Sequence, residues 1–178
     1  LGDLTGGALG FGRIGREVIN RLKPFACKIL VHDPVASADA IAKGGATSAS
    51  LEEIYRQSDL ITLHCPSLPQ TKGMLNKATF AQMKKGVMIV NAGRGDLIIG
   101  DDLIEALRSG QVGSAALDVT SPEPPAVDSP LRSFPQVIIH SHIASASVLS
   151  GGKLRRSVAE HAARALRGEK PINVVNGL

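Results

Sequence analysis

The stretch Gly10-Phe11-Gly12-Arg13-Ile14-Gly15 decides the fold of this 178-residue chain. It reads G-x-G-x-x-G, and it lies where a short apolar run gives way to a helical pattern of apolar residues. In such a motif the first glycine permits a tight turn, the second lets a pyrophosphate approach the backbone, and the third lets the helix pack closely on the strand. The N–H groups of the helix's first turn would face the phosphates, with the positive end of the helix dipole behind them.

An acidic residue follows the next apolar run. The segment 28–32 has the composition of a buried strand and ends at Asp33, near the ~20-residue distance at which a dinucleotide-binding unit carries the acid for the ribose 2′-hydroxyl. The alternative is a flexible turn followed by an Asp that caps a helix before Pro34. A strand, a glycine-rich turn, a helix and an acid in this order favour a dinucleotide site over that alternative.

The composition indicates one soluble domain with a proper core, because 43% of the residues are hydrophobic and 20% are charged. Aromatic residues make up only 3% and Trp is absent, which argues against a stacking surface for single-stranded nucleic acid. The net charge is +4, but the Lys and Arg residues are scattered rather than clustered. We therefore expect no nucleic-acid partner.

The two cysteines, Cys27 and Cys65, form neither a disulfide framework nor a metal-binding spacing, so no metal is expected. The sequence shows no signal peptide and no long apolar span. These features predict a cytoplasmic protein without a membrane partner.

Apolar runs of strand length alternate with helical patterns along the chain. Most runs are apolar without alternation, as expected of parallel strands that are buried on both faces. The sequence therefore predicts an α/β fold, a Rossmann-type doubly wound parallel sheet of about six strands with helices on both faces. We expect residues 1–178 to form one dinucleotide-binding domain, in which the proline-rich segment 121–135 is a rigid loop. The predicted strands are 7–10, 28–32, 60–64, 87–91, 114–119 and 137–140.

Helix signals fall between these runs. Ser50 and Glu53 have the spacing of a capping box. Further helices are expected between Ser37 and Gly44, from Asn76 to Gly86, from Asp101 to Gly110, and over 153–167. In doubly wound sheets, ligands bind at the carboxyl ends of the strands. The candidate site residues are therefore those just after each run, namely Asp33, 64–66, 91–95, Asp118 and 140–145.

These strand ends carry motifs that resemble the NAD-binding domain of the D-isomer-specific 2-hydroxyacid dehydrogenase family. The resemblance runs from about Leu4 to Val175. The loop 118–124 is similar to that of glyoxylate and hydroxypyruvate reductases within the family. The motifs are Gly-Phe-Gly-Arg-Ile-Gly (10–15), His-Asp-Pro (32–34), Leu-His-Cys-Pro (63–66), Asn-Ala-Gly-Arg-Gly (91–95), Leu-Asp-Val (117–119), Pro-Glu-Pro (122–124) and His-Ile-Ala-Ser (142–145).

The resemblance implies hydride transfer between NAD(H) and a small 2-keto or 2-hydroxy acid. Such a reaction needs a cation for the substrate carboxylate and a proton donor for the carbonyl oxygen. Arg94 matches the family's cation, and its planar guanidinium can hold a carboxylate through two hydrogen bonds. His142 matches the family's acid. Glu123 matches the carboxylate that orients the imidazole.

The resemblance also implies which residues contact NAD. Asp118 matches the position that accepts a hydrogen bond from the nicotinamide carboxamide. Taken singly, Arg94 could be a surface charge, Glu123 a loop acid and Asp118 a strand-end cap. Their joint placement at strand ends favours the functional interpretation. The expected cofactor contacts are Gly10, Gly12, Arg13, Ile14, Gly15, Asp33, His64, Cys65, Pro66, Asn91, Ala92, Gly93, Asp118, Ala144 and Ser145.

Some features depart from the family pattern. His140-Ser141 replaces the usual Thr-Pro before the catalytic His, and strand alternation predicts that the side chains of His140 and His142 point to the same side. Gly151-Gly152 would open the last helix, where acidic residues are usual. The first strand lacks about three residues, so 7–9 is short beside the ~5–6 residues of a typical strand.

Family members also carry a separate substrate domain, and active sites of this kind lie between two domains. We therefore expect this chain to be a fragment that is inactive by itself. The resemblance also implies that it forms a homodimer, since relatives usually pair through this domain. Two other functions stay open. A dinucleotide-sensing scaffold, such as the corepressors built on this fold, can keep Arg94, Glu123 and His142. Formate dehydrogenase is disfavoured, because its members carry Gln where Glu123 stands.

Overall fold

The computed structural model describes residues 2–170 and 172. Its contacts divide the chain into two units, Leu1–His142 and Ile143–Leu178. The first unit contains the whole sheet, and the second contains one long helix. The unit boundary follows His142 directly.

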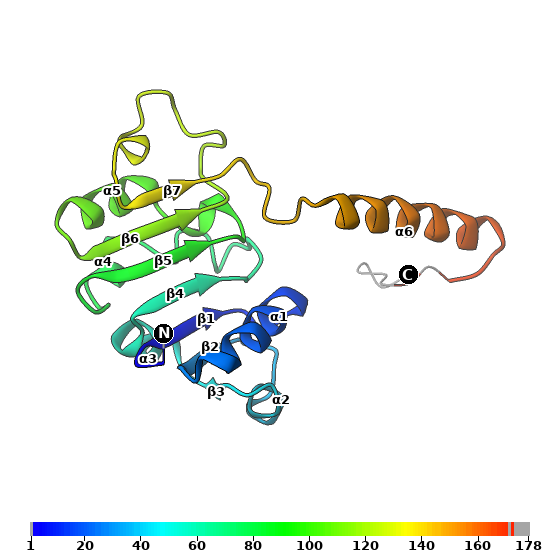
Figure 1. The fold of residues 1–178 in the computed structure, drawn as a ribbon, viewed down its shortest axis with the longest axis horizontal. Coiled ribbons are helices and arrows are strands. Elements are labelled where there is room, and N and C mark those ends of the chain that lie inside the picture. The colour runs from blue at the N-terminus through cyan, green and yellow to red at the C-terminus, as the bar shows by residue number, and fades with distance from the viewer. Residues whose placement is uncertain (1, 171, 173–178) are drawn as a thin grey trace. The chain divides into compact units, whose positions relative to one another are not determined.

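The first unit is built on a seven-stranded parallel sheet with the strand order β3-β2-β1-β4-β5-β6-β7 (Figure 1). The order reverses at β1, which pairs with β2 on one side and β4 on the other. In the register Leu9 lies opposite both His32 and Leu63, so the loops that follow these three strands begin at one level. The strands are β1 (Thr5–Leu9), β2 (Lys28–His32), β3 (Thr47–Ser48), β4 (Leu60–Leu63), β5 (Val87–Asn91), β6 (Val112–Leu117) and β7 (Val137–Ile139).

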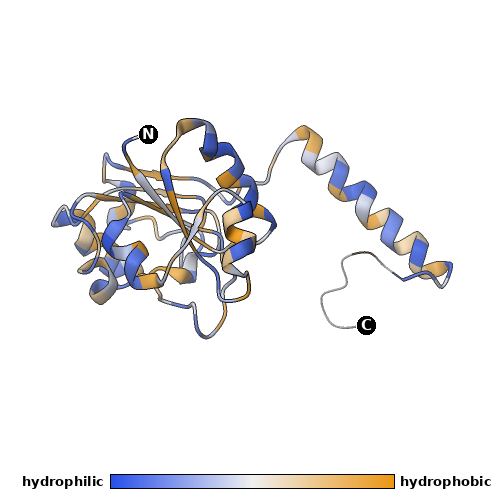
Figure 2. Cartoon of the chain, turned by 90° about the horizontal axis from the view of Figure 1, so that it is seen from below, coloured by the Kyte–Doolittle hydropathy of each residue, from blue (hydrophilic) through white to orange (hydrophobic). Residues whose placement is uncertain are grey.

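Helices lie on both faces of this sheet. Neighbouring residues of a strand point to opposite faces. Leu30 belongs to a large core cluster that includes residues of α3, α4 and α5, whereas Ile29 and Val31 belong to a smaller cluster with α1 and α2. Figure 2 shows the hydrophobic strands in the middle of this unit, flanked by helices. The helices are α1 (Arg13–Leu22), α2 (Ala38–Lys43), α3 (Leu51–Gln57), α4 (Lys77–Phe80) and α5 (Gly100–Arg108), with 3-10 turns η1 (Lys23–Phe25), η2 (Gly95–Leu97) and η3 (Pro130–Arg132).

The predicted doubly wound parallel sheet is confirmed, with seven strands instead of about six. β2 and β5 have the predicted bounds, β4 and β7 each end one residue earlier, and β6 begins and ends two residues earlier than the predicted 114–119. β1 has five residues and begins at Thr5, because Thr5 pairs with Lys28 and Gly6 pairs with both Ile29 and Leu60. The first strand is therefore not too short. The short β3 was missed because two residues give no apolar periodicity.

The helix boundaries also differ in places. α4 ends at Phe80, so the prediction that it continues to Gly86 was wrong. In the second unit α6 (Val148–Leu166) begins five residues earlier than predicted. Ser147 and Ser150 cap it reciprocally, each hydroxyl accepting from the other residue's backbone N–H. The glycines 151 and 152 thus lie inside the helix instead of opening it.

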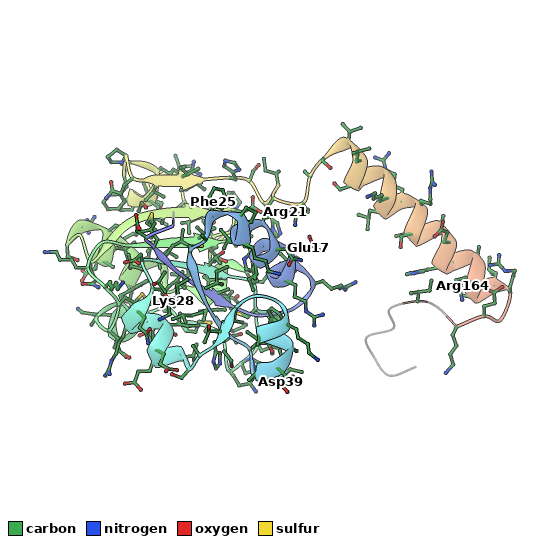
Figure 3. The ribbon with its side chains drawn as sticks, turned by 60° about the horizontal axis from the view of Figure 1, so that its bottom comes forward. Glu17, Arg21, Phe25, Lys28, Asp39 and Arg164 are labelled. Carbon is green, nitrogen blue, oxygen red and sulfur yellow. The ribbon has the colours of Figure 1, made fainter. Side chains whose placement is uncertain are left out.

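The exposed surface of α1 carries an ion pair. Glu17 and Arg21 form an ion pair one turn apart on α1, and both side chains are exposed (Figure 3). Such exposed pairs contribute little to stability. Within the described residues, no helix combines the length and the apolar character that crossing a membrane requires.

Candidate cofactor and active site

The glycine-rich turn between β1 and α1 is shaped by contacts that exclude side chains. Gly10 has a φ of +110°, and a Cβ there would lie 2.8 Å from the backbone of both His64 and Cys65. A Cβ on Gly15 would overlap the carbonyl of Gly10. The close approach at Gly15 agrees with the predicted packing of the helix on the strand. The contact of Gly10 with the loop after β4 was not predicted from the sequence.

The amino end of α1 is open. Gly12 is its N-cap, no side chain caps the helix, and the first turn carries no acidic residue. A Cβ placed on Gly12 would meet nothing within 4 Å. The first-turn residues Arg13 and Ile14 are exposed. This end of the helix fits an anionic group such as a pyrophosphate, because N–H groups at a helix amino terminus bind phosphates.

Asp33, directly after β2, accepts three backbone hydrogen bonds that hold the neighbouring loops. Its Oδ2 accepts from Phe11 N–H at 2.6 Å, and its Oδ1 accepts from Val35 and Ala36 N–H at 2.8 and 2.9 Å. Partial burial raises the pKa of this carboxyl, but the three backbone hydrogen bonds outweigh it, so the pKa of Asp33 lies below its ordinary value. A carboxylate has about four acceptor sites, so the ionised group retains capacity for a ribose hydroxyl.

The loop after β4 carries His64, Cys65 and Pro66. The imidazole Nε2 of His64 lies 3.0 Å from Thr62 Oγ1, and burial lowers the pKa of this histidine. Burial likewise raises the pKa of the Cys65 thiol. Both residues are half-buried and uncharged at neutral pH, so this loop contributes shape and neutral polar groups rather than charge.

The loop after β5 is folded by Asn91, which is buried with 1% of its surface exposed. Its Oδ1 accepts from Gly93 N–H at 3.0 Å, and its Nδ2 donates to the Arg94 carbonyl at 2.9 Å. Both functional groups of Asn91 are thus used to hold the turn that includes Ala92. Arg94 itself is exposed, and its Nη1 donates to the Gly93 carbonyl at 2.7 Å.

The loop after β6 brings the predicted acid and its carboxylate together. His142 Nδ1 lies 2.8 Å from Glu123 Oε1, although the two residues are 19 apart in sequence. The two side chains are 47% and 42% exposed, so they remain accessible to a ligand. The backbone N–H of His142 donates to the Asp118 carbonyl at 2.9 Å, which fixes the histidine beside the end of β6.

The expectation that His140 and His142 point to the same side assumed an extended segment, and the structure does not keep that conformation through His142. β7 ends at Ile139, and His142 has a φ of +58°, outside the extended conformation on which alternation depends. Of the two histidines, His142 is the one that bonds to Glu123 in the described part of the chain. The turn after β7 therefore distinguishes the two histidines.

One polar cluster beside the site was missed by the sequence analysis. Asp96 Oδ2 accepts from Ser67 Oγ at 2.7 Å and lies 3.4 Å from Lys72 Nζ. The Ser67 hydrogen bond, opposed by burial and supported by Lys72, holds the pKa of Asp96 below its ordinary value. The cluster ties the loop after β4 to the Arg94 loop. Residues 29 apart in two loops share no periodic signal, so only the folded chain shows their contact.

The last two predicted cofactor contacts, Ala144 and Ser145, belong to the second unit. There the Ser145 carbonyl accepts from Ser150 Oγ at 2.6 Å, next to the amino end of α6. Their contact with a cofactor stays a prediction.

Comparison with known sequences agrees with this geometry. Residues 1–144 match the family model described as "D-isomer specific 2-hydroxyacid dehydrogenase, NAD binding domain". The chain is 40% identical over 176 residues to D-3-phosphoglycerate dehydrogenase from Rattus norvegicus, covering 99% of this chain and 33% of that protein. It is 39% identical over 170 residues to hydroxypyruvate reductase from Blautia hydrogenotrophica, covering 96% of this chain and 52% of that protein. The chain thus spans between a third and about half of these relatives.

Solved structures give the same result. The apo-structure of D-lactate dehydrogenase from Escherichia coli superimposes with a TM-score of 0.85 at 34% identity, over 96% of this chain and 54% of that chain. D-lactate dehydrogenase with NAD+ from Lactobacillus jensenii superimposes with a TM-score of 0.87 at 28% identity, over 97% of this chain and 56% of that one. The glycine-rich turn and the hydrogen bonds to Asp33 agree with the family match. This chain belongs to the D-isomer-specific 2-hydroxyacid dehydrogenase family, of which it is the NAD-binding domain.

Proposed function

We propose that the full-length protein reduces a small 2-keto acid with NADH, and oxidises the matching 2-hydroxy acid with NAD. The observation that carries the proposal is the contact between His142 Nδ1 and Glu123 Oε1 at 2.8 Å, at the carboxyl end of a sheet that binds NAD in this family. A histidine held by a carboxylate in such a place suits general acid–base catalysis.

The residues divide the work as follows. NAD(H) supplies or accepts the hydride. The N–H groups at the start of α1 and the Asp33 carboxylate would hold its pyrophosphate and ribose. Arg94 would bind the substrate carboxylate, because a guanidinium offers two parallel donors to a carboxylate.

Proton transfer is assigned to His142. Its Nδ1 faces Glu123, and among the described residues its Nε2 has no hydrogen-bond partner. Nε2 would therefore give its proton to the substrate carbonyl oxygen during reduction and take it back during oxidation. Glu123 would keep the ring in one orientation and stabilise the imidazolium while it is charged.

Asp33 also supports NAD over NADP. A 2′-phosphate would meet the negative charge of this carboxylate, and the next four residues, 34–37, include no Arg or Lys to neutralise it. The low pKa of Asp33 keeps that charge present throughout the physiological range.

The substrate is proposed as a class. Relatives are named for 3-phosphoglycerate, hydroxypyruvate and D-lactate, each of which is a small 2-hydroxy or 2-keto acid. The likeness of loop 118–124 to glyoxylate and hydroxypyruvate reductases favours those two keto acids. A homodimer and a cytoplasmic location complete the proposal. Both thiols of the described structure are unpaired, as is usual in a reducing compartment.

The test is a rate assay on the full-length protein with hydroxypyruvate, glyoxylate, pyruvate and phosphohydroxypyruvate, each with NADH and with NADPH. We expect at least one keto acid to be reduced with NADH in clear preference to NADPH. Tight NADH binding without turnover of any of the four would instead support the dinucleotide-sensing scaffold.

A further inference from the structure

The Arg94 loop and the loop that leads to Glu123 touch through backbone atoms at Gly95. A Cβ at Gly95 would overlap the carbonyl of Thr120 and lie 2.8 Å from the Ser121 nitrogen. These are backbone atoms, which cannot swing aside as the tip of a long side chain can. The φ of Gly95 is not in the left-handed region, so the position requires glycine for space alone.

The two segments that meet at this contact each carry a residue of the proposed active site. Arg94 precedes Gly95, and Glu123 follows Thr120 by three residues. The Thr120 hydroxyl donates to the Pro122 carbonyl at 2.7 Å, which folds that loop toward Glu123. The Gly95 contact therefore joins the loop that carries Arg94 to the loop that carries Glu123, and Glu123 bonds to His142.

The Arg94 loop cannot retreat easily from this contact. Asn91 clamps the Arg94 carbonyl, and Ser67 holds the carboxylate of Asp96. The Asp96 carbonyl also accepts from Gly73 N–H at 2.8 Å. Anything added at Gly95 must therefore displace either the Arg94 loop or the Thr120 loop.

We infer that Gly95 is a positioning residue, which sets the separation between Arg94 and the Glu123–His142 pair. The inference rests on the proposed function. A displacement of about 1 Å between groups that must act together can lower a rate about 100-fold. One methyl group at this contact is large enough to cause such a displacement.

Gly100 offers a matched control in the same segment. A Cβ on Gly100 would meet the Ser121 carbonyl at 3.6 Å, which is an ordinary van der Waals contact. Gly95→Ala and Gly100→Ala thus add the same methyl group against the same loop, and only the first one overlaps it.

The experiment compares the wild-type full-length enzyme with both variants. The readouts are kcat and KM for a 2-keto acid, kcat/KM for the neutral amide of the same acid, and the Kd of NADH. We expect Gly95→Ala to lower kcat/KM for the acid about 10- to 100-fold with a raised KM. The preference for the acid over its amide should shrink, because that preference reports on Arg94. NADH should bind within about twofold of wild type, and Gly100→Ala should resemble wild type.

Unchanged acid kinetics in Gly95→Ala would overturn the inference, as would a loss of NADH binding in parallel with activity, which indicates general damage. If Gly95→Ala does not fold, Thr120→Val leaves the backbone contact with Gly95 in place and tests whether the position of the Thr120 loop controls the site. It removes the hydroxyl bond to Pro122, and we expect kcat to fall several-fold with NADH binding intact; an unchanged kcat would overturn the inference. A wild type that reduces no 2-keto acid would overturn the proposed function and this inference with it.

Discussion

At the scale of single residues, three glycines let the loops of the site pack on one another. Gly10 lies against the backbone of the β4 loop. A Cβ added to Gly93 would lie 3.3 Å from the carbonyl oxygens of Leu63 and Cys65. Gly95 lies against the Thr120 peptide. The loop after β4 therefore contacts the loops after β1 and β5, and the loop after β5 also contacts the loop after β6. A residue larger than glycine would disturb each of these contacts.

Asp33 serves both the loop and the cofactor, so its removal should be costly. Asp33→Ala deletes the proposed ribose acceptor and also the acceptor of Phe11, Val35 and Ala36 N–H. A hydrogen bond to a charged group contributes about 1.5–3 kcal/mol. We therefore expect NADH binding by the full-length protein to weaken about 10- to 100-fold, measured by calorimetry. NADPH binding as tight as NADH binding in the wild type would contradict the assignment.

The candidate site could be predicted from sequence where a motif and a strand end coincided. Glu123 and His142 were expected to act together, and the structure places them in hydrogen-bond contact. The Ser67–Asp96 bond could not be predicted, because loop side chains meet only after the strands have aligned. The difference between His140 and His142 depends on one left-handed residue, which no periodic pattern reveals.

At the scale of elements, sequence patterns located best the strands whose middle residues are all apolar. β2 and β5 have the predicted bounds, because each contains an uninterrupted apolar run that ends at a polar residue. β1 begins earlier than predicted because pairing on both sides extends it through Thr5 and Gly6, which have little strand signal of their own. Gly7 belongs there because a Cβ would lie 2.7 Å from Ile54 on α3. Tertiary packing thus decided the boundaries that local preference left open.

Asp59 joins three strands at their amino ends, so its charge should matter for stability. Its Oδ2 accepts from Thr5 N–H at 2.8 Å and its Oδ1 from Lys84 Nζ at 2.8 Å, while its carbonyl accepts from Met88 N–H at 2.9 Å. In Asp59→Asn the amide cannot accept from both donors. We expect the free energy of unfolding to fall by about 1–2 kcal/mol at pH 7 in a urea titration, after allowance for solvent screening. The exposed Asp128→Asn serves as the control and should show no change.

The same carboxylate should make stability depend on pH. The Lys84 hydrogen bond and then the Thr5 N–H lower the pKa of Asp59 below its ordinary value of 3.8. Its stabilising contribution is therefore complete above about pH 4 and is lost as the pH falls through the lowered pKa. Urea titrations between pH 7 and pH 3 should show a smaller loss of stability for Asp59→Asn than for wild type. Parallel curves for the two proteins would rule out this role.

At the scale of the whole molecule, the chain corresponds to the NAD-binding part of longer relatives. Its relatives are two to three times longer, since it covers 33% of one and 52% of another. Arg94, Glu123 and His142 are all exposed on the first unit, as expected of groups that face a substrate.

We therefore expect these 178 residues alone to bind NADH weakly and to show negligible turnover with any 2-keto acid. Water would reach the reacting groups freely, and no substrate domain would hold the keto acid against them. A fluorescence titration with NADH and a rate assay on the isolated chain would check both points. Turnover close to that of the full-length enzyme would show that the chain needs no substrate domain for catalysis.

The central claim is that His142, held by Glu123, is the acid of a 2-keto acid reductase. It is tested most directly by kcat for keto-acid reduction in full-length His142→Ala, with His140→Ala as the matched control. A positioned acid contributes about 10²- to 10⁴-fold. The account predicts a loss of that size in His142→Ala with NADH binding intact, and a far smaller loss in His140→Ala, whose histidine does not bond to Glu123. An active His142→Ala beside an inactive His140→Ala would contradict it.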